Sequence, residues 1–500
     1  MEAEENSGVK RTNAMPWRQY ISSRFTTLEP PMDRVVNPIK ALRMLNCEQW
    51  NFFGCAWSGW IMDSFDFFTV SLTLPQLATE FNKNNSDMTW GITLALMFRP
   101  VGSFIFGLLS DRFGRRWPFV LNNLMFIVLE LGTGFCKTYD QFLVCRAFFG
   151  IAMGGIYGNC VATALEDCPN PARGIVSGLF QSGYPLGYVL ATAMNRALVD
   201  TTRYGWRPLF WFSACPPVLI ILWRLMLLET KAFRDRQMLC RAPSNATPTF
   251  LDKAWTALRG YWLSIIYMVF LMSGFSFISH GAQDLYPTML VTELELTPNQ
   301  LTTTQVVANI GGFLGAIVVG NISEIVGRRL AIIVSCTVAA AMLYPYTRVH
   351  TPGLMVAAFF VQFATQGAFG VLPSHLMELS PADIRSIVVG TAYQLGSLAS
   401  SGSATIQAEI GEKYFPLPLG ASGQRRYDYG IVICAFLGAA IALVVATTFL
   451  GPENKGREFG LEGEEAQQAA ATREEVLLMS RAESKNSLAE DEDGYIPTLA

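Results

Sequence analysis

Three side chains that can bind an anion or carry a proton lie close together in one apolar stretch, Ser276–Thr288. They are His280, Gln283 and Asp284, and such groups are costly in hydrocarbon unless they face protein or water. His280 and Asp284 are four residues apart and share a helix face, which Gln283 flanks. The cluster is therefore a candidate functional site. The alternative is a polar helix end that the outer surface wets, with Pro287 bending or ending the helix.

A second set of charged residues lies inside two other apolar stretches. Arg99 carries a permanent charge on a planar fork that fits a carboxylate, so it predicts an anion site. Asp63 and Asp66 are three residues apart on one helix face. A carboxyl group deep in a membrane is costly to ionise, which makes these two acids candidate proton carriers. The alternative is that Arg99 and the acids form structural ion pairs.

The composition predicts the elements that position these residues. Of the 500 residues, 51% are hydrophobic and only 15% are charged, against about 25% charged residues in soluble proteins. Stretches of roughly 20 apolar residues, the length that a bilayer requires, predict an all-α membrane protein with twelve transmembrane helices. The predicted spans are 51–78, 89–110, 117–136, 141–163, 174–195, 207–228, 261–290, 301–320, 330–347, 352–376, 386–407 and 429–450.

The distribution of basic residues predicts the orientation. Seven Lys or Arg residues precede the first span, and that side of the membrane holds twenty in all against about nine on the other. The positive-inside bias therefore predicts that both termini are cytosolic. The predicted parts are a tail (1–49), a six-helix bundle (50–228), a central loop (229–259), a second bundle (260–451) and an acidic, disordered tail (452–500) that could bind regulatory partners.

The chain repeats itself. The segment Gly107–Arg116 (GLLSDRFGRR) returns 213 residues later as Gly320–Arg329 (GNISEIVGRR). Glu166 and Arg173 return 212 residues later as Glu378 and Arg385, and a third acidic pair, Glu229 and Glu453, ends each half. Similar offsets in different motifs predict two pseudo-symmetric six-helix halves in the same orientation.

The repeated charges predict a gate at the cytosolic face. Acids and arginines placed at the ends of different helices can form inter-helix ion pairs that break when the halves move. A turn with positive-inside charge would explain the arginines, but neither the placed acids nor the repetition. The predicted gate residues are Asp111, Arg115, Glu166 and Arg173, with their counterparts Glu324, Arg328, Glu378 and Arg385.

These motifs carry a resemblance. The twelve spans, GLLSDRFGRR and the segment Arg146–Gly155 (RAFFGIAMGG) resemble the major facilitator superfamily over residues 50–451. The segment SHGAQDLYPT resembles the seventh-span signature of the fungal lactate/carboxylate–proton symporters, in the sialate–proton symporter group. Ser279, His280, Gln283, Asp284 and Thr288 match that signature, whereas Ser276 and Ala282 depart from it. Tyr393–Ser397 resembles a second substrate motif, with Ser397 in place of Asn, and Arg99 resembles the substrate-binding arginine.

The resemblance implies a secondary active transporter of the plasma membrane. It would carry small monocarboxylates of the lactate, pyruvate and acetate class with a proton, by alternating access around one central polar cavity. Substrate would bind Arg99, His280, Gln283, Asp284, Gln394 and Ser397. His280 and Asp284 would handle the proton, with Asp63 and Asp66 as the alternative carriers.

Two other functions stay open at this point: a transporter of another solute (a dicarboxylate, a sialate-like acid or a sugar) and a nutrient sensor that does not transport. The sequence has no phosphate-binding loop, no metal-ligand constellation and no nucleophile–base spacing. We therefore predict no enzyme, no cofactor, no metal and no nucleic-acid partner.

Overall fold

The computed structural model describes residues 23–25, 28, 37–83, 85–199, 201–241, 250–349, 353–381, 384–418 and 426–457. The acidic tail from residue 458 onward, with its predicted regulatory partners, lies outside these residues, as does most of the N-terminal tail. Apart from turns and connecting segments, the described part is helical except for one short antiparallel hairpin, in which β1 (Pro416–Leu417) pairs with β2 (Arg426–Tyr427).

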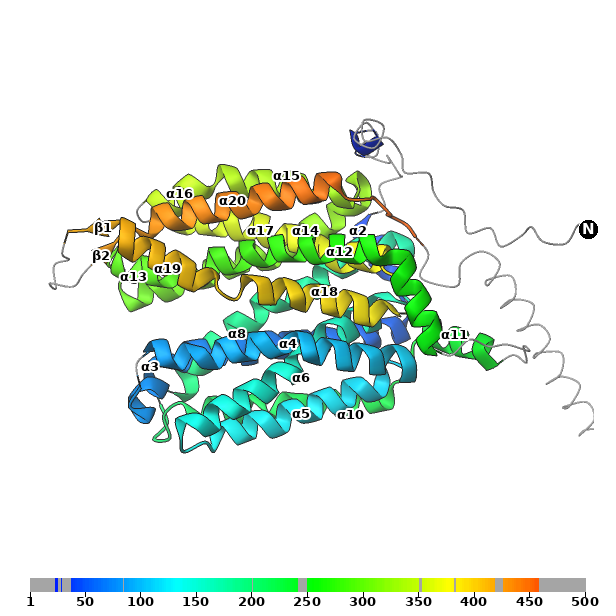
Figure 1. The fold of residues 1–500 in the computed structure, drawn as a ribbon, viewed down its shortest axis with the longest axis horizontal. Coiled ribbons are helices and arrows are strands. Elements are labelled where there is room, and N and C mark those ends of the chain that lie inside the picture. Colours follow the sequence, from blue (N-terminus) through cyan, green and yellow to red (C-terminus); the bar gives the residue numbers. More distant parts are fainter. Residues whose placement is uncertain are drawn as a thin grey trace, which may run out of the picture.

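The helices fall into two bundles, the first made from the N-terminal half of the chain and the second from the C-terminal half (Figure 1). The N-terminal half contains α2 (Pro38–Arg43), α3 (Cys47–Phe81), α4 (Asn85–Phe113), α5 (Arg116–Gly134), α6 (Tyr139–Leu165), the 3-10 turn η1 (Asn170–Ala172), α7 (Arg173–Gln181), α8 (Gly183–Leu198), α9 (Arg207–Ser213) and α10 (Cys215–Met226).

Helix α11 (Lys231–Arg241) follows the first bundle. The C-terminal half contains α12 (Phe250–Gln283), α13 (Tyr286–Thr292), α14 (Pro298–Val326), α15 (Arg328–Ala341), α16 (Leu343–Arg348), α17 (Gly353–Leu379), α18 (Arg385–Ser400), α19 (Ser403–Tyr414) and α20 (Tyr429–Leu450). Helix α12 begins inside the predicted central loop, ten residues before the predicted bundle boundary at 260.

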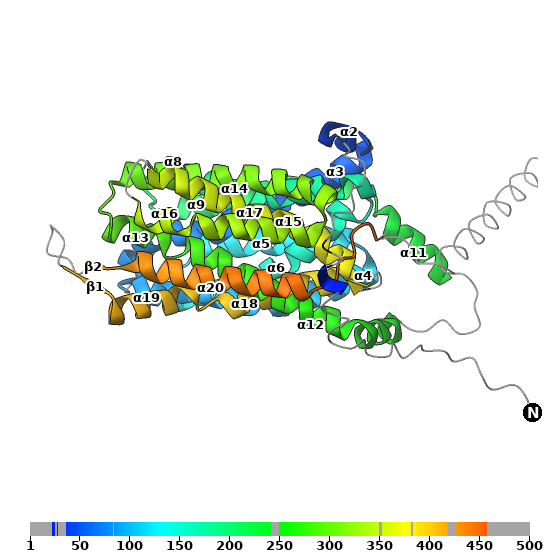
Figure 2. The ribbon, with the colours of Figure 1, turned by 90° about the horizontal axis from the view of Figure 1, so that it is seen from above.

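The long helices run side by side along one axis in both views (Figures 1 and 2). We call the end where α2 and α11 lie the motif end, because the repeated motifs after α4 and α14 are found there. The opposite end carries α13 and the β1–β2 hairpin, and we call it the hairpin end.

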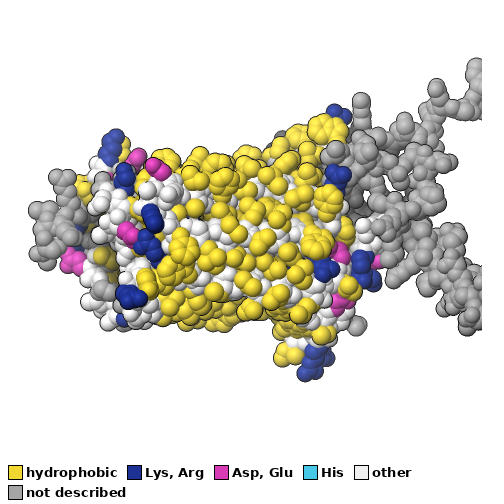
Figure 3. All heavy atoms as spheres, turned by 90° about the horizontal axis from the view of Figure 1, so that it is seen from below, with side chains coloured by type: hydrophobic (Ala, Val, Ile, Leu, Met, Phe, Trp, Pro, Cys, Tyr) yellow, Lys and Arg dark blue, Asp and Glu magenta, His cyan; other side chains and the backbone are white. Residues whose placement is uncertain are grey.

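The outer surface is that of a membrane protein. A broad apolar belt covers the middle of the molecule, and charged side chains gather at its two ends (Figure 3). Large apolar side chains are exposed on this belt, among them Leu219 and Leu263, which are 69% and 65% exposed. Eight helical segments of the described residues are long and apolar enough to span a bilayer.

Four more segments complete the twelve predicted spans. They are α3, α5, the pair α7–α8 and the pair α18–α19, and they are less apolar because they turn polar residues inward. Helix α3 buries Asp63 and Asp66, and α5 buries Glu130. The predicted all-α membrane fold with two six-helix bundles is confirmed, with several spans divided into two helices.

Prolines account for most of these divisions. Four breaks lie two or three residues before a proline, which removes a backbone donor and clashes with the preceding turn. The break between α12 and α13 falls at Asp284 and Leu285, before Pro287, so the predicted bend lies directly beside the polar cluster. The other three precede Pro185, Pro216 and Pro345.

Glycines let the innermost helices cross closely. In the apolar stretch of α6 that could span a membrane, 89% is buried inside the protein, as expected for a helix that is apolar all round. A Cβ at Gly102 of α4 would lie 1.8 Å from the Ile151 carbonyl oxygen of α6. The second half repeats this crossing between α14 and α17, where a Cβ at Gly315 would lie 2.0 Å from the Phe363 carbonyl oxygen.

We predict that Gly102→Ala destabilises the protein by about 1–3 kcal/mol, because a backbone atom cannot yield to the new methyl group and the helices must separate. The midpoint of thermal unfolding in detergent should fall. Gly260→Ala is the control, since nothing lies within 4 Å of a Cβ there and alanine favours a helix by about 1 kcal/mol. Equal midpoints for the two variants would contradict the close crossing.

Candidate functional site

The repeated motifs build one arginine cluster in each half. In the first half, Arg115 forms ion pairs with Asp111 at 2.5 Å and with Glu166 at 2.7 Å. All three side chains are buried. Each arginine follows a glycine with a positive φ, 97° at Gly114 and 95° in the second half, a backbone conformation that favours glycine.

The second half repeats this geometry. Arg328 forms ion pairs with Glu324 at 2.6 Å and with Glu378 at 3.0 Å. The third acidic pair also has equivalent positions, because Glu229 accepts from the backbone N–H of Arg116 at 3.1 Å and Glu453 from that of Arg329 at 2.9 Å. Burial raises the pKa of Glu453, and the backbone N–H donors oppose that shift.

Two acids of these clusters also join the two halves. Asp111 accepts from the backbone N–H groups of Ser386 and Ile387 at 3.2 and 2.9 Å, at the start of α18 in the other half. Glu324 accepts from the N–H of Gly174 at the start of α7. Each carboxylate thus binds the positive end of a helix from the opposite bundle.

The ion pairs of Arg115 and Arg328 join helices of the same half. The contacts of Asp111 and Glu324 with backbone N–H groups join one half to the other. They are supported by Ser177, whose hydroxyl donates to the Gly370 carbonyl at 2.7 Å and accepts from the Ser374 N–H at 3.0 Å. The two halves are therefore closed against each other at the motif end.

Arg173 and Arg385 occupy equivalent positions, as the first residues of α7 and α18. Both are buried. Arg173 donates to the carbonyl of Cys168 at 3.4 Å and to that of Arg457. All eight predicted gate residues thus lie at the motif end.

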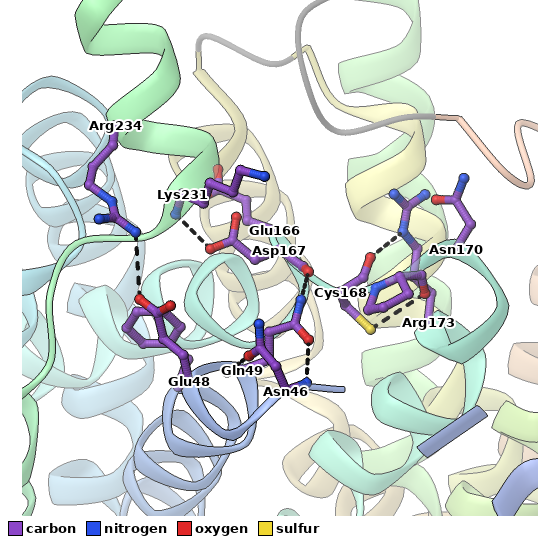
Figure 4. Close-up of a pocket in the computed structure, with 12 residues that line it drawn as sticks. Asn46, Glu48, Gln49, Glu166, Asp167, Cys168, Asn170, Arg173, Lys231 and Arg234 are labelled. Carbon is purple, nitrogen blue, oxygen red and sulfur yellow. Dashed lines mark hydrogen bonds and ion pairs between the residues drawn. The ribbon is translucent and has the colours of Figure 1, made fainter. Parts of the chain in front are cut away.

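A cavity of about 540 Å³ opens at the motif end between α3, the loop after α6 and α11 (Figure 4). Several charged groups that line it have partners within the chain. Arg234 pairs with Glu48 at 3.5 Å, and Asp167 accepts from the backbone N–H groups of Lys231 and Ala232 at 2.6 and 2.9 Å. Burial raises the pKa of Asp167. These contacts attach the central helix α11 to the first bundle.

Arg99 lies in the interior of α4, only 6% exposed. Gly154 brings α6 so close that a Cβ there would be 1.9 Å from the Arg99 carbonyl oxygen. The guanidinium donates to the Met153 sulfur at 3.0 Å and lies over the Phe67 ring at 5.1 Å. Among the described residues, no carboxylate lies within 4.0 Å of it, so the structural ion pair with Asp63 or Asp66 is not formed in this structure.

The two acids of α3 are buried without ion pairs in the described part of the chain. Asp63 has one oxygen, and Asp66 both oxygens, without a hydrogen-bond partner in the protein. Next to them lies an acid that the sequence analysis missed, Glu130 of α5. It pairs with Arg146 of α6 at 3.0 Å and accepts from Ser213 at 3.2 Å. The argument applied to Asp63 would have found Glu130, an acid in the middle of a predicted span.

The polar cluster of the seventh span lies at the break between α12 and α13. The Nδ1 atom of His280 is 2.9 Å from the Asp284 carboxylate, and both side chains are partly exposed. Gln283 points to another helix and donates to Gln362 of α17 at 3.1 Å. The Tyr346 hydroxyl donates to the Ala282 carbonyl at 2.6 Å and thereby fixes the helix end.

The span-eleven residues lie on α18. Gln394 is buried, and its carbonyl oxygen has no partner in the protein. Ser397 donates to the Tyr393 carbonyl at 3.2 Å. No direct hydrogen bond or ion pair links Arg99 to the side chains of His280, Gln394 or Ser397 among the described residues.

Aromatic rings fill the interface between the halves beside Arg99, a feature that the sequence analysis missed. Tyr157 of α6 stacks on Tyr393 of α18 with 3.8 Å between ring centroids. Trp60 of α3 contacts both rings, at 5.0 and 5.8 Å. Tyr184 of α8 packs against Trp60 and lies within electrostatic range of Arg99 and of Asp284. These rings lie where the two halves meet, between α3, α6 and α18.

Comparison with known proteins identifies the family that has this architecture. Residues 39–461 match the model of the sugar (and other) transporter family. The chain belongs to this family. It is 37% identical to a carboxylic acid transporter protein homolog of Saccharomyces cerevisiae, over 91% of this chain and 77% of that protein.

More distant relatives and a solved structure agree with the fold. The chain is 28% identical to a cis,cis-muconate transport protein of Acinetobacter baylyi, over 70% of this chain and 84% of that protein. The structure of the proton:xylose symporter XylE superposes with a TM-score of 0.68 at 18% identity and covers 82% of this chain and 98% of that one. The protein is thus a major facilitator transporter and not an enzyme.

We predict that Asp111→Asn loosens the motif end, because an amide binds the positive end of α18 more weakly than a carboxylate does. Turnover should fall several-fold with a modest change in substrate affinity. A cysteine placed at Ser386 should react faster with a membrane-impermeant thiol reagent applied from the motif-end side. Equal labelling rates with and without the Asp111→Asn substitution would contradict this assignment. The control is Asp140→Asn, in the first turn of α6, at the hairpin end.

Proposed function

We propose that this transporter carries small monocarboxylates of the lactate, pyruvate and acetate class together with a proton, by alternating access. We also propose that it lies in the plasma membrane with the motif end, and both termini, in the cytosol. The observation that supports the proposal most is Arg99, a buried guanidinium with no carboxylate within 4.0 Å among the described residues. A charge in that position is expensive unless an anion joins it.

The substrate chemistry follows from the donors around the interface. Arg99 holds the carboxylate by a charge-assisted, two-pronged hydrogen bond. Gln283 and Gln394 supply neutral amide donors from α12 and α18, and Ser397 a hydroxyl. The 37% identical carboxylic acid transporter homolog of yeast supports an acid as the substrate.

The proton has two possible carriers in this structure. His280 and Asp284 share a contact of 2.9 Å near the hairpin end, and an imidazole can both accept and release a proton. Asp63 and Asp66 are the alternative, both buried and without ion pairs in the described chain. Moving one proton with one monocarboxylate anion makes the step electroneutral.

The gate completes the cycle. With the motif end closed, as in this structure, substrate and proton enter from the hairpin end. Breaking the contacts of Asp111 and Glu324 with the opposite half then opens the path to the cytosol. The intra-half ion pairs of Arg115 and Arg328 stay intact through this motion, because their partners belong to the same bundle.

A dicarboxylate is the second candidate substrate, because a relative 28% identical to this chain is a cis,cis-muconate transport protein. Uptake of radiolabelled lactate, pyruvate, succinate and glucose at about pH 5 and about pH 7, in cells without their own carriers, separates these functions. We expect lactate and pyruvate uptake to be faster at the lower pH and to collapse with a protonophore. Uptake of succinate alone would favour the dicarboxylate, and uptake of none would favour a sensor.

We predict that Arg99→Lys raises the KM for lactate about tenfold or more, because a point charge does not replace the two-pronged contact. The measurement is the concentration dependence of initial uptake. Arg203→Lys is the matched control, an arginine near the hairpin end that contacts Tyr204 and should leave the KM unchanged. An unchanged KM in Arg99→Lys would remove this residue from the substrate site.

We predict that His280→Ala lowers lactate uptake and flattens its dependence on external pH, because the proposed proton carrier of the His280–Asp284 contact is lost. Uptake is measured across external pH at fixed lactate, beside Asp63→Asn and Asp66→Asn. A wild-type pH profile in His280→Ala, with a flat profile in either aspartate variant, would assign the role of proton carrier to that aspartate of α3.

A further inference from the structure

One face of α3 carries a row of polar atoms that lack partners. Trp57, Trp60 and Asp63 follow one another at intervals of three residues, so their side chains lie on one side of the helix, about one turn apart. The indole Nε1 of Trp57, that of Trp60 and one Asp63 oxygen are all buried without a hydrogen-bond partner in the protein. The row runs from beside Arg99 toward the motif end, where α3 begins.

The two indole edges converge on one glycine. Gly183 begins α8, directly after the break in the fifth span. A Cβ at this glycine would lie 3.0 Å from Trp57 Nε1 and 3.1 Å from Trp60 Cδ1, the carbon bonded to the Trp60 nitrogen. Both N–H edges therefore point toward the same backbone, in a place that only glycine leaves free of a side chain.

Tyr157 brings a third donor to this region. Its ring contacts Trp60 at 5.0 Å, and its hydroxyl is buried without a partner in the protein. The ring is stacked at 3.8 Å on Tyr393, which belongs to the other half. This stack joins the two bundles beside Trp60, so it must separate when the bundles part at the motif end.

We infer that these donors form a second carboxylate-binding position, on the motif-end side of Arg99, which substrate occupies on its way to the cytosol. It consists of the indole N–H groups of Trp57 and Trp60 and the hydroxyl of Tyr157. The inference rests on the proposed function. An indole N–H can only donate, so the ligand must be an acceptor, and a carboxylate that leaves Arg99 is one.

The neutral character of this position suits release. A guanidinium binds a carboxylate through charge-assisted bonds, whereas indole and phenol groups offer only neutral donors. This site binds the anion more weakly than Arg99 does and lies one helix turn further along the path. The anion can therefore leave Arg99 while other hydrogen-bond donors still contact it. In the closed state the same donors are buried without partners, which is unfavourable. Carboxylate binding in the open state satisfies them.

The test compares substrate affinity from the two sides of the membrane. Lactate transport is measured in right-side-out and inside-out vesicles with wild type, Tyr157→Phe and Tyr188→Phe. Tyr157→Phe removes only a hydroxyl and keeps the ring. We expect its KM on the motif-end side to rise about tenfold, with an unchanged KM on the hairpin-end side. Tyr188→Phe, a ring that packs on Phe68 at 4.5 Å, is the control and should match wild type on both sides.

The outcomes separate this inference from the proposed function. Wild type that does not move lactate in either direction defeats the proposed function. Active wild type, with Tyr157→Phe unchanged on both sides or weakened equally on both, overturns the second position.

A binding measurement tests the position without transport. Lactate is titrated into the purified protein in detergent, and tryptophan emission is compared between wild type and the variant Trp57→Phe/Trp60→Phe. A saturable difference between the two supports a carboxylate at the indoles. Identical responses, or no response in either protein, overturn it.

Discussion

The cost of placing a charge in hydrocarbon is the constraint on which this structure depends. The protein meets it in two ways. At the motif end, Arg115 and Arg328 each receive two carboxylates, and the side chains of Arg115 and of its partners are fully buried. In the centre, Arg99 contacts a sulfur atom and the face of an aromatic ring, and no carboxylate of the described residues lies within 4.0 Å of it. The first arrangement is complete within the chain, and the second is suited to an anion from outside.

The same contrast separates rigid parts from moving parts. Ion pairs hold helices together within a half, whereas the halves meet through contacts of Asp111 and Glu324 with helix N-termini. Breaking a buried ion pair would leave a charge without compensation, which is strongly destabilising. The free-energy cost is much smaller when a carboxylate exchanges backbone N–H groups for water and keeps its arginine partner. In the proposed cycle, the pseudo-symmetric placement of the two acids would let both contacts open in one motion.

The sequence predicted the features that depend on local pattern or on repetition. Apolar runs predicted the spans, and the repeated motifs predicted two similar halves, because each signal lies within a short segment. The polar contacts between distant segments were harder to predict. The motifs predicted a cluster of Asp111, Arg115, Glu166 and Arg173 but not the individual pairs, such as that of Glu166 with Arg115, 51 residues away in sequence. The aromatic interface was missed because Trp60, Tyr157 and Tyr393 look like ordinary core residues until their helices are placed together.

The position of the aromatic interface gives these rings a part in coupling the centre to the gate. Tyr393 precedes the candidate substrate residue Gln394 on α18, the helix whose first turn Asp111 holds at the motif end. Tyr157 lies on α6, which packs against Arg99 through Gly154. The ring stack and the Asp111 contact thus hold the same helix, α18, at two heights. In the proposed cycle, a carboxylate bound at Arg99 would lie beside this stack, and opening of the gate would require both the stack and the Asp111 contact to separate.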